Sequence, residues 1–232
     1  NVDIVWNPNP KPTPSVAPRD LRLPLSIDVA RVRVSVGTSA LWGEAPLREL
    51  DGRVQLLQRK HEITLKSLSY ERWSGRGHGV MQTMGKLQLD AQLVAVGQYQ
   101  NAESTHALEA NVVASGSLRE LNLAANLSAK TEAGTQSMTA HTKLTLWEAW
   151  PLRALTVNAR DFDLASANVK WPKTRVSGKA AFSEVKGQMQ SEVALTNAMP
   201  GPWSHGRIPV RSLRGTTRFG FDGTQSDWLA KF

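Results

Sequence analysis

The chain has 232 residues, no cysteine and a formal net charge of +8. The lack of cysteine excludes disulfides, thiolate metal ligands and a cysteine nucleophile. No apolar run approaches the ~20 residues that a membrane-spanning helix needs, and the length allows one all-β domain or two small ones. The positive charge suits an anionic partner, but Lys and Arg are dispersed along the chain, which favours a solvated surface.

Residues 1–24 form a proline-rich stretch that holds half of the 12 prolines. Such a segment is extended and cannot donate along a strand ladder, so we expect a linker or a strap, with a disordered leader as the alternative. The chain begins with Asn1, which is not a natural start residue. We therefore interpret it as an excised piece of a longer protein, whose targeting signals are not informative here.

Alternating apolar and polar residues begin at Leu21 and continue to Val36. This period of two predicts a half-buried β-strand, and a change of phase near Ala30 and Arg31 predicts a β-bulge. The glycine-rich residues 73–79 are not followed by a helical pattern, as a phosphate-binding loop requires. We expect a twisted turn or a bulge there.

The same alternation recurs along most of the chain and is clearest between Ser117 and Leu146. Strands are expected over residues 50–56, 63–70, 80–84, 87–96, 107–114, 121–129, 138–147, 152–159, 175–182, 188–195 and 213–221. Residues 163–170 are expected to hold one helical turn and residues 227–232 to begin a helix. Roughly eleven to thirteen strands with regular turn signals predict an all-β fold.

A short unit recurs at the start of several expected strands. Leu47-Arg48-Glu49-Leu50 reappears as Leu118-Arg119-Glu120-Leu121 and, with one change, as residues 152–155. Recurring units indicate a stack in which each unit buries its apolar face against its neighbours, and chance recurrence of a common tetrapeptide is the alternative.

No arrangement of residues typical of catalysis or metal binding is found. The five histidines are scattered, Ser74 and Ser177 lack a nucleophile elbow, and Asp161 with Asp163 fits a solvated turn better than a cation site. We therefore expect no enzyme, no metal and no cofactor. Tryptophans at strand ends are expected either to border a groove at headgroup level or to pack beneath loops.

One face of nearly every expected strand is aliphatic. The candidate ligand-contacting residues are Leu87, Leu89, Leu93, Leu121, Leu123, Leu127, Leu144, Leu146, Leu155, Val157, Val193 and Leu195. Such a face must be covered by a second sheet, by the same sheet or by a ligand, and aliphatic side chains match acyl chains. Alternation by itself leaves open whether these residues form a dry core or line a trough.

Several stretches together carry a resemblance to a known family. They are Trp147-Glu-Ala-Trp150-Pro151-Leu152-Arg153-Ala154-Leu155, Phe162-Asp163-Leu164, Trp171-Pro172, Val176-Ser177-Gly178-Lys179-Ala180 and Leu23-Pro-Leu-Ser-Ile-Asp-Val29. With these stretches the chain resembles the TamB family of AsmA-like bridge proteins. The resemblance implies an elongated, curled, antiparallel-rich sheet that forms a taco-like trough with an apolar interior. Residues 25–222 would form this repeating β-groove, and residues 223–232 its truncated end.

The resemblance also implies a function and a location. Phospholipid acyl chains would move along the trough between the inner and outer membranes, in support of outer-membrane biogenesis. The full-length protein would be anchored in the inner membrane and lie in the periplasm of a Gram-negative bacterium. The alternative is a scaffold that assembles outer-membrane barrels and autotransporters with a barrel partner of the TamA type, through regions absent here. Nucleic acid is not expected as a partner, because no motif of a binding module is present.

Overall fold

The computed structural model describes residues 16–37, 47–100, 105–131, 134–148, 150–168, 170–185, 187–220 and 226–231. The strands are β1 (Ile27–Gly37), β2 (Leu47–Leu56), β3 (Lys60–Tyr70), β4 (Trp73–Gln82), β5 (Gln88–Gln100), β6 (Thr105–Ser117), β7 (Glu120–Thr131), β8 (Gly134–Leu144), β9 (Leu152–Phe162), β10 (Val176–Val185), β11 (Gln188–Asn197), β12 (Ser212–Gly220) and β13 (Ser226–Lys231). One short helix, α1 (Leu164–Ala167), and a 3₁₀ turn, η1 (Trp203–His205), complete the described elements.

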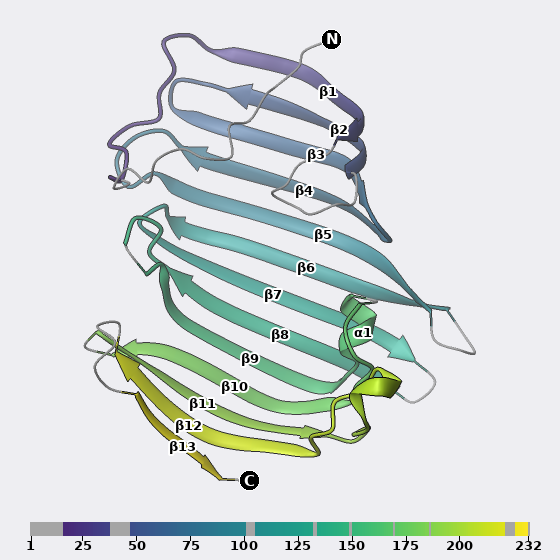
Figure 1. The fold of residues 1–232 in the computed structure, drawn as a ribbon. Coiled ribbons are helices and arrows are strands. Elements are labelled where there is room, and N and C mark those ends of the chain that lie inside the picture. Colours follow the sequence, from purple (N-terminus) through teal and green to yellow (C-terminus); the bar gives the residue numbers. More distant parts are fainter. Residues whose placement is uncertain are drawn as a thin grey trace.

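All 13 strands form one sheet in which spatial order follows chain order, from β1 to β13. Every neighbouring pair is antiparallel, so the sheet is a continuous meander of hairpins. The sheet is elongated and curled (Figure 1), and β1 and β13 lie at opposite ends without pairing to each other. The prediction of an all-β, curled and elongated antiparallel sheet is therefore confirmed. A closed barrel is ruled out for the described strands.

The register carries one set of apolar residues across the sheet. Residues directly opposed in an antiparallel pair lie on the same face, so Leu123 shares its face with Ala114 on β6 and Thr142 on β8. We call this the apolar face. In the central strands its large members are Leu89, Leu93, Val112, Leu121, Leu123, Leu127, Met138, Leu144, Leu155 and Val157.

The opposite face of the same strands is polar, and we call it the polar face. It includes Gln92, Asn111, Asn122, Asn126, Thr139, His141, Lys143 and Asn158. Hydrogen bonds cross between strands here, as from Gln92 Nε2 to Asn111 Oδ1 over 3.0 Å. This face also carries Val94, Val96 and Val113, so it is mostly, not wholly, polar. The two faces differ because strand side chains alternate with a strict period of two.

The bulge expected near Ala30 and Arg31 is confirmed. The register of β1 against β2 shifts between Val29, which opposes Val54, and Val32, which opposes Gly52. The extra residue restores a common phase, so that the apolar residues on both sides of the bulge lie on one face.

Two sequence-based predictions need correction. Residues 73–79 do not form a turn but belong to β4, where Gly75, Gly77 and Gly79 oppose Ala95, Leu93 and Ala91 of β5. The bulge given as the other possibility is present opposite these glycines, because the register shifts between Leu65, which opposes Gly77, and Leu68, which opposes Gly75. A Cβ atom at Gly77 would lie 2.8 Å from the carbonyl oxygen of Gln92. These glycines therefore permit close strand approach and do not mark a chain reversal. Residues 226–231 form β13 and not the start of a helix, because pairing with β12 overrides the local pattern.

Other expected boundaries shift by a few residues. The first strand begins at Ile27 and not at Leu21, and β8 ends at Leu144, before Trp147. The helical turn expected within residues 163–170 is present as α1. Residues 1–15 of the proline-rich stretch lie outside the described residues. Leu21, in its described part, donates its N–H to the carbonyl oxygen of Thr83 over 2.9 Å and so lies beside the β4–β5 turn.

Candidate functional site

Ten of the twelve candidate residues lie together on the apolar face. They belong to β5, β7, β8, β9 and β11: Leu89, Leu93, Leu121, Leu123, Leu127, Leu144, Leu155, Val157, Val193 and Leu195. Leu121 directly opposes Leu144, and Val157 opposes Ala180, which in turn opposes Val193. The face is thus continuous from β5 to β11.

The two other candidates lie outside the strands. Leu87 precedes β5 with a φ of 50° and is buried at 4% exposure in the β4–β5 turn. Leu146 follows β8, in the connection to β9, and is 38% exposed. Neither belongs to the strand rows of the apolar face, because the alternation that suggested them continues past the ends of the paired segments.

Sequence reasoning left several members of this face out of the candidate set. Val112 lies between Leu93 and Ala125, and Phe182 opposes Leu155 across the β9–β10 pair. Both lie in strands that the alternation had predicted, so the period of two could have found them. Phe162 could not be found in this way, since a register shift separates it from Ala159.

Exposure varies along the apolar face. Near its two ends Ile63, Leu213 and Ile27 are 52%, 44% and 38% exposed, whereas the central leucines are half-buried. Leu108, Ala129 and Phe162 form a buried cluster at one side of the sheet, with exposures of 0%, 3% and 0%. At the opposite side Leu121 and Met189 are buried as well, at 7% and 1% exposure. Trp73, Leu127, Met138, Ala159, Leu164 and Ala167 pack against this cluster.

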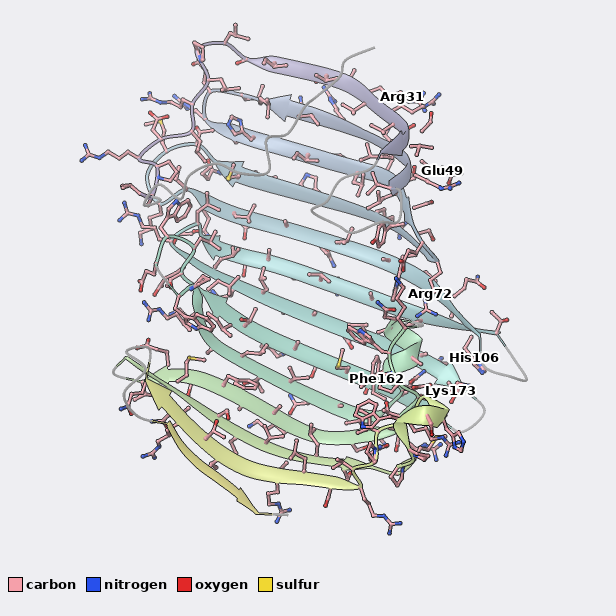
Figure 2. All side chains as sticks on the ribbon, in the orientation of Figure 1. Arg31, Glu49, Arg72, His106, Phe162 and Lys173 are labelled. Carbon is pink, nitrogen blue, oxygen red and sulfur yellow. The ribbon has the colours of Figure 1, made fainter. Side chains whose placement is uncertain are left out.

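Helix α1 covers this buried cluster, and hydrogen bonds at both of its ends hold it in place. Asp163 caps the helix: its Oδ1 accepts the N–H of Ala165 over 3.1 Å and that of Thr174 over 2.9 Å. At the other end Arg72 Nη2 donates to the carbonyl oxygens of Ala165 (3.2 Å) and Ser166 (2.6 Å). Figure 2 shows Arg72 and Phe162 on opposite sides of α1. The helix thus covers one margin of the apolar face.

A hollow of about 180 Å³ opens at this side of the apolar face. It is lined chiefly by Val176, Leu195, Ile208, Val210 and Leu213. Its walls come from β10, β11, the start of β12 and the connection before β12. These are aliphatic side chains, which suit an apolar group without selecting its chemistry.

Two larger hollows lie on the polar face. One, of about 450 Å³, is lined by Ala181, Ser183, Gln190, Glu192, Thr216 and Arg218 among others. The other, of about 280 Å³, is lined by residues that include Val113, Asn122, His141, Lys143, Ala154 and Thr156. Both combine polar side chains with small apolar ones such as Ala181 and Ala154.

The titratable groups stabilise the strands and their connections. The backbone N–H of Gly187, and then the Arg153 guanidinium, hold the pKa of Glu184 below its ordinary value. Arg153 reaches the Glu184 carboxylate at 2.6 Å and also pairs with Glu148. Hydrogen bonds from Lys60 and then His78 likewise lower the pKa of Glu62.

No metal-binding group of three or more His, Asp or Glu is found in the part of the chain that the structure describes. The pair considered in the sequence has local roles: Asp163 caps α1, and Asp161, at a φ of 47°, has its N–H bound by Ser177 Oγ over 2.8 Å. The candidate ligand-contacting residues thus lie mainly on the apolar face.

The chain matches no family model, no curated protein and no solved structure with which it was compared. Within the described residues, the helices are all too short or too polar to cross a bilayer.

Proposed function

We propose that this chain is a segment of a TamB-like periplasmic bridge in which the apolar face lines a trough for phospholipid acyl chains. The trough would carry lipid between the inner and outer membranes and so support outer-membrane biogenesis. The observation that carries the proposal is the continuity of the apolar face through neighbouring strands, from Ile63 on β3 to Leu213 on β12.

The dimensions of the sheet support this proposal. Thirteen strands spaced at the usual interval give a face about 58 Å long, roughly twice the ~30 Å hydrocarbon thickness of a bilayer. Each methylene group moved from water onto such a face gains up to about 0.8 kcal/mol. A lipid tail could therefore be held by many weak contacts along the face, without one specific site.

The chemistry of the face supports passage along it. Its central rows are Leu, Val, Ala and Met, with Thr142 as a polar member between Leu123 and Leu155. Leu127 opposes Met138 in the same rows, and the flexible thioether of methionine adapts to differently shaped neighbours. Because little here fixes one position, a chain of methylenes can shift along the face at low cost.

A scaffold for outer-membrane proteins is the second candidate, and β1 favours it. In the described part of the chain this strand pairs only with β2, and its Ile27 and Val29 are each 38% exposed. A free edge of this kind can accept another strand by β-augmentation. The bulge and the charged Arg31 and Arg33 weaken that edge as a template, so we place this function second.

Site-specific photo-crosslinking tests the proposal. A photoreactive amino acid is placed in turn at Leu123, at Leu144 and, as the control, at Lys143 on the polar face. After exposure to phospholipid, mass spectrometry identifies the adducts. We expect lipid adducts at the two leucine positions and none at Lys143. A folded chain that captures no lipid at either leucine, or as much at Lys143, would contradict the trough and favour the scaffold.

A further inference from the structure

Two long connections lie next to each other on one side of the sheet. Residues 163–175 join β9 to β10, and residues 198–211 join β11 to β12. Lys173 donates its N–H to the carbonyl oxygen of Gly206 over 2.8 Å and forms an isolated parallel bridge with Arg207. We call these paired connections the cationic rim. Figure 2 shows Lys173 there, at the same side of the sheet as Phe162.

Asn197 fixes the cationic rim to the end of β11. This side chain is 7% exposed, and its Oδ1 accepts the N–H groups of Arg175 and Met199, each over 3.1 Å. Its Nδ2 donates to the carbonyl oxygen of Val210 over 3.3 Å. Because the buried Asn197 amide forms hydrogen bonds to backbone groups of both connections, it holds the two connections together.

The part of the chain that contains this rim has many cations and few acids. Residues 164–220 contain nine Lys and Arg and two Glu, so their balance of +7 accounts for nearly all of the chain's +8. The two acids lie elsewhere: Glu184 binds Arg153 at the opposite end of β10, and Glu192 lies on the polar face of β11. Five of the nine cations belong to the rim, and Lys179, Lys186, Arg214 and Arg218 lie outside it.

Within the rim itself the cations outnumber the acids. The five cations are Lys170, Lys173, Arg175, Arg207 and Arg211. The one acid is Asp163, whose carboxylate already accepts two backbone N–H groups at the start of α1. On the same side of the sheet Asp161 and Glu71 are exposed, at the end of β9 and in the β3–β4 turn. The rim therefore presents a positive potential to solvent.

Two tryptophans project from the same rim. Trp171 is 50% exposed and Trp203 is 65% exposed, and each lies within two residues of a Lys or His. A half-exposed indole combines an apolar ring with an N–H donor, which suits the boundary between lipid tails and headgroups. The apolar hollow lined by Val176, Leu195 and Ile208 opens beside it.

We propose that the cationic rim docks on the surface of a membrane that contains anionic phospholipid. Its lysines and arginines contact the phosphate groups, while Trp171 and Trp203 insert at headgroup depth. This docking does not depend on lipid transport along the apolar face, because it rests on the rim alone. It would place one side of the curled sheet against a bilayer.

Vesicle flotation tests the docking. The purified chain is mixed with phosphatidylcholine vesicles, either alone or with one-third phosphatidylglycerol, and the bound fraction is measured at low and high salt. We expect binding only with the anionic lipid and a clear loss at high salt. Each basic residue near such a surface adds about fivefold in affinity, so Lys170→Gln with Lys173→Gln should weaken binding roughly 25-fold.

The opposite side of the sheet offers matched controls. Lys86 and Arg119 are exposed in turns there, so Lys86→Gln with Arg119→Gln removes the same charge and should leave binding within about twofold. Trp171→Ser with Trp203→Ser should reduce binding and remove the shift in tryptophan fluorescence that we expect when the indoles enter the headgroup region. Trp150→Ser, at a position 43% exposed in the β8–β9 connection, should do neither.

The outcomes separate the rim from the trough. If the Lys170/Lys173 and Lys86/Arg119 double variants lose the same affinity, the docking is overturned and the attraction to the vesicle is a general one. If the chain binds equally well to vesicles without anionic lipid, the docking is also overturned, and contact through the apolar face is indicated. Retained binding in the two rim variants overturns it as well. Lipid crosslinking at Leu123 should persist in the rim variants when detergent-dispersed lipid is supplied. Circular dichroism confirms that each variant keeps its strand content.

Discussion

Trp73 on β4 covers Gly97 on β5. The two residues are directly opposed on the apolar face, and a Cβ atom at Gly97 would lie 2.9–3.0 Å from three carbon atoms of the indole ring. Trp73 in turn packs against the cluster of Leu108, Ala129 and Phe162 beneath α1. The absence of a side chain at Gly97 therefore permits the tryptophan to reach the buried margin of the sheet.

The first prediction concerns this contact. Gly97→Ala should destabilise the fold by about 1–3 kcal/mol, because the indole must shift out of a packed site. The midpoint of urea unfolding measures the effect. Gly79→Ala is the control, since its Cβ would meet the Ala91 Cβ atom at 3.2 Å and can be accommodated by a small shift. Combining Gly97→Ala with Trp73→Leu should cost less than the sum of the two single changes. Strict additivity would show that the two residues do not interact.

The second prediction concerns the attachment of α1. Arg72→Met removes the guanidinium that donates to the last carbonyl groups of the helix and should cost about 2 kcal/mol, because hydrogen bonds to charged donors are among the stronger ones. Amide hydrogen exchange should increase first in residues 164–168. Arg76→Met, on the polar face of β4, is the matched control and should leave that exchange unchanged. If α1 stays equally protected in Arg72→Met, the Asp163 cap and the packing of Leu164 and Ala167 hold the helix without Arg72.

The third prediction concerns the dependence of stability on pH. The Gly187 N–H and Arg153 lower the pKa of Glu184 in the folded chain. A lowered folded pKa gives stability that is present above the unfolded value of about 4.3 and is lost as the pH falls through the folded value. Wild type should therefore exceed Glu184→Gln in unfolding midpoint at neutral pH, and the difference should shrink below about pH 4.3.

The control for this titration is Glu192→Gln, an exposed position on the polar face of β11. This change removes an acid without touching the contacts of Gly187 and Arg153, so its unfolding midpoint at neutral pH should stay close to that of wild type. A difference between wild type and Glu184→Gln that grows on acidification would contradict the assignment, because the charged form would then not be the stabilised one.

The fourth prediction concerns ligand binding on the apolar face. Leu123→Arg places a charge between Ala114 and Thr142, in the middle of the proposed trough. It should lower lipid capture by a crosslinker at Leu144 roughly tenfold or more, since unpaired polar groups against hydrocarbon cost about 1–3 kcal/mol each. Asn122→Arg adds the same charge one residue away, on the polar face, and should leave capture unchanged. Equal capture in the two folded variants would exclude Leu123 from the lipid path.

The alternation of apolar and polar residues determined much of the local structure of this protein. The period of two predicted the strands and grouped Leu121, Leu123 and Leu127 on one face, because a strand alternates its side chains whatever its neighbours are. The change of phase near Ala30 predicted the bulge for the same reason, since an inserted residue reverses the parity of all that follow. The positions of ten candidate residues followed directly from this pattern.

Other features depended on tertiary contacts. The glycines of β4 suggested a turn, and only the close approach of β5 explains why they form a strand. Leu87 and Leu146 continued the alternation but lie in turns, because pairing, and not pattern, ends a strand. The order of the strands and the open ends of the sheet depend on which strands pair with each other. No short stretch of sequence specifies that pairing. The cover of α1 over Phe162 and the paired connections held by Asn197 join residues far apart in sequence, so only the folded chain could bring them together.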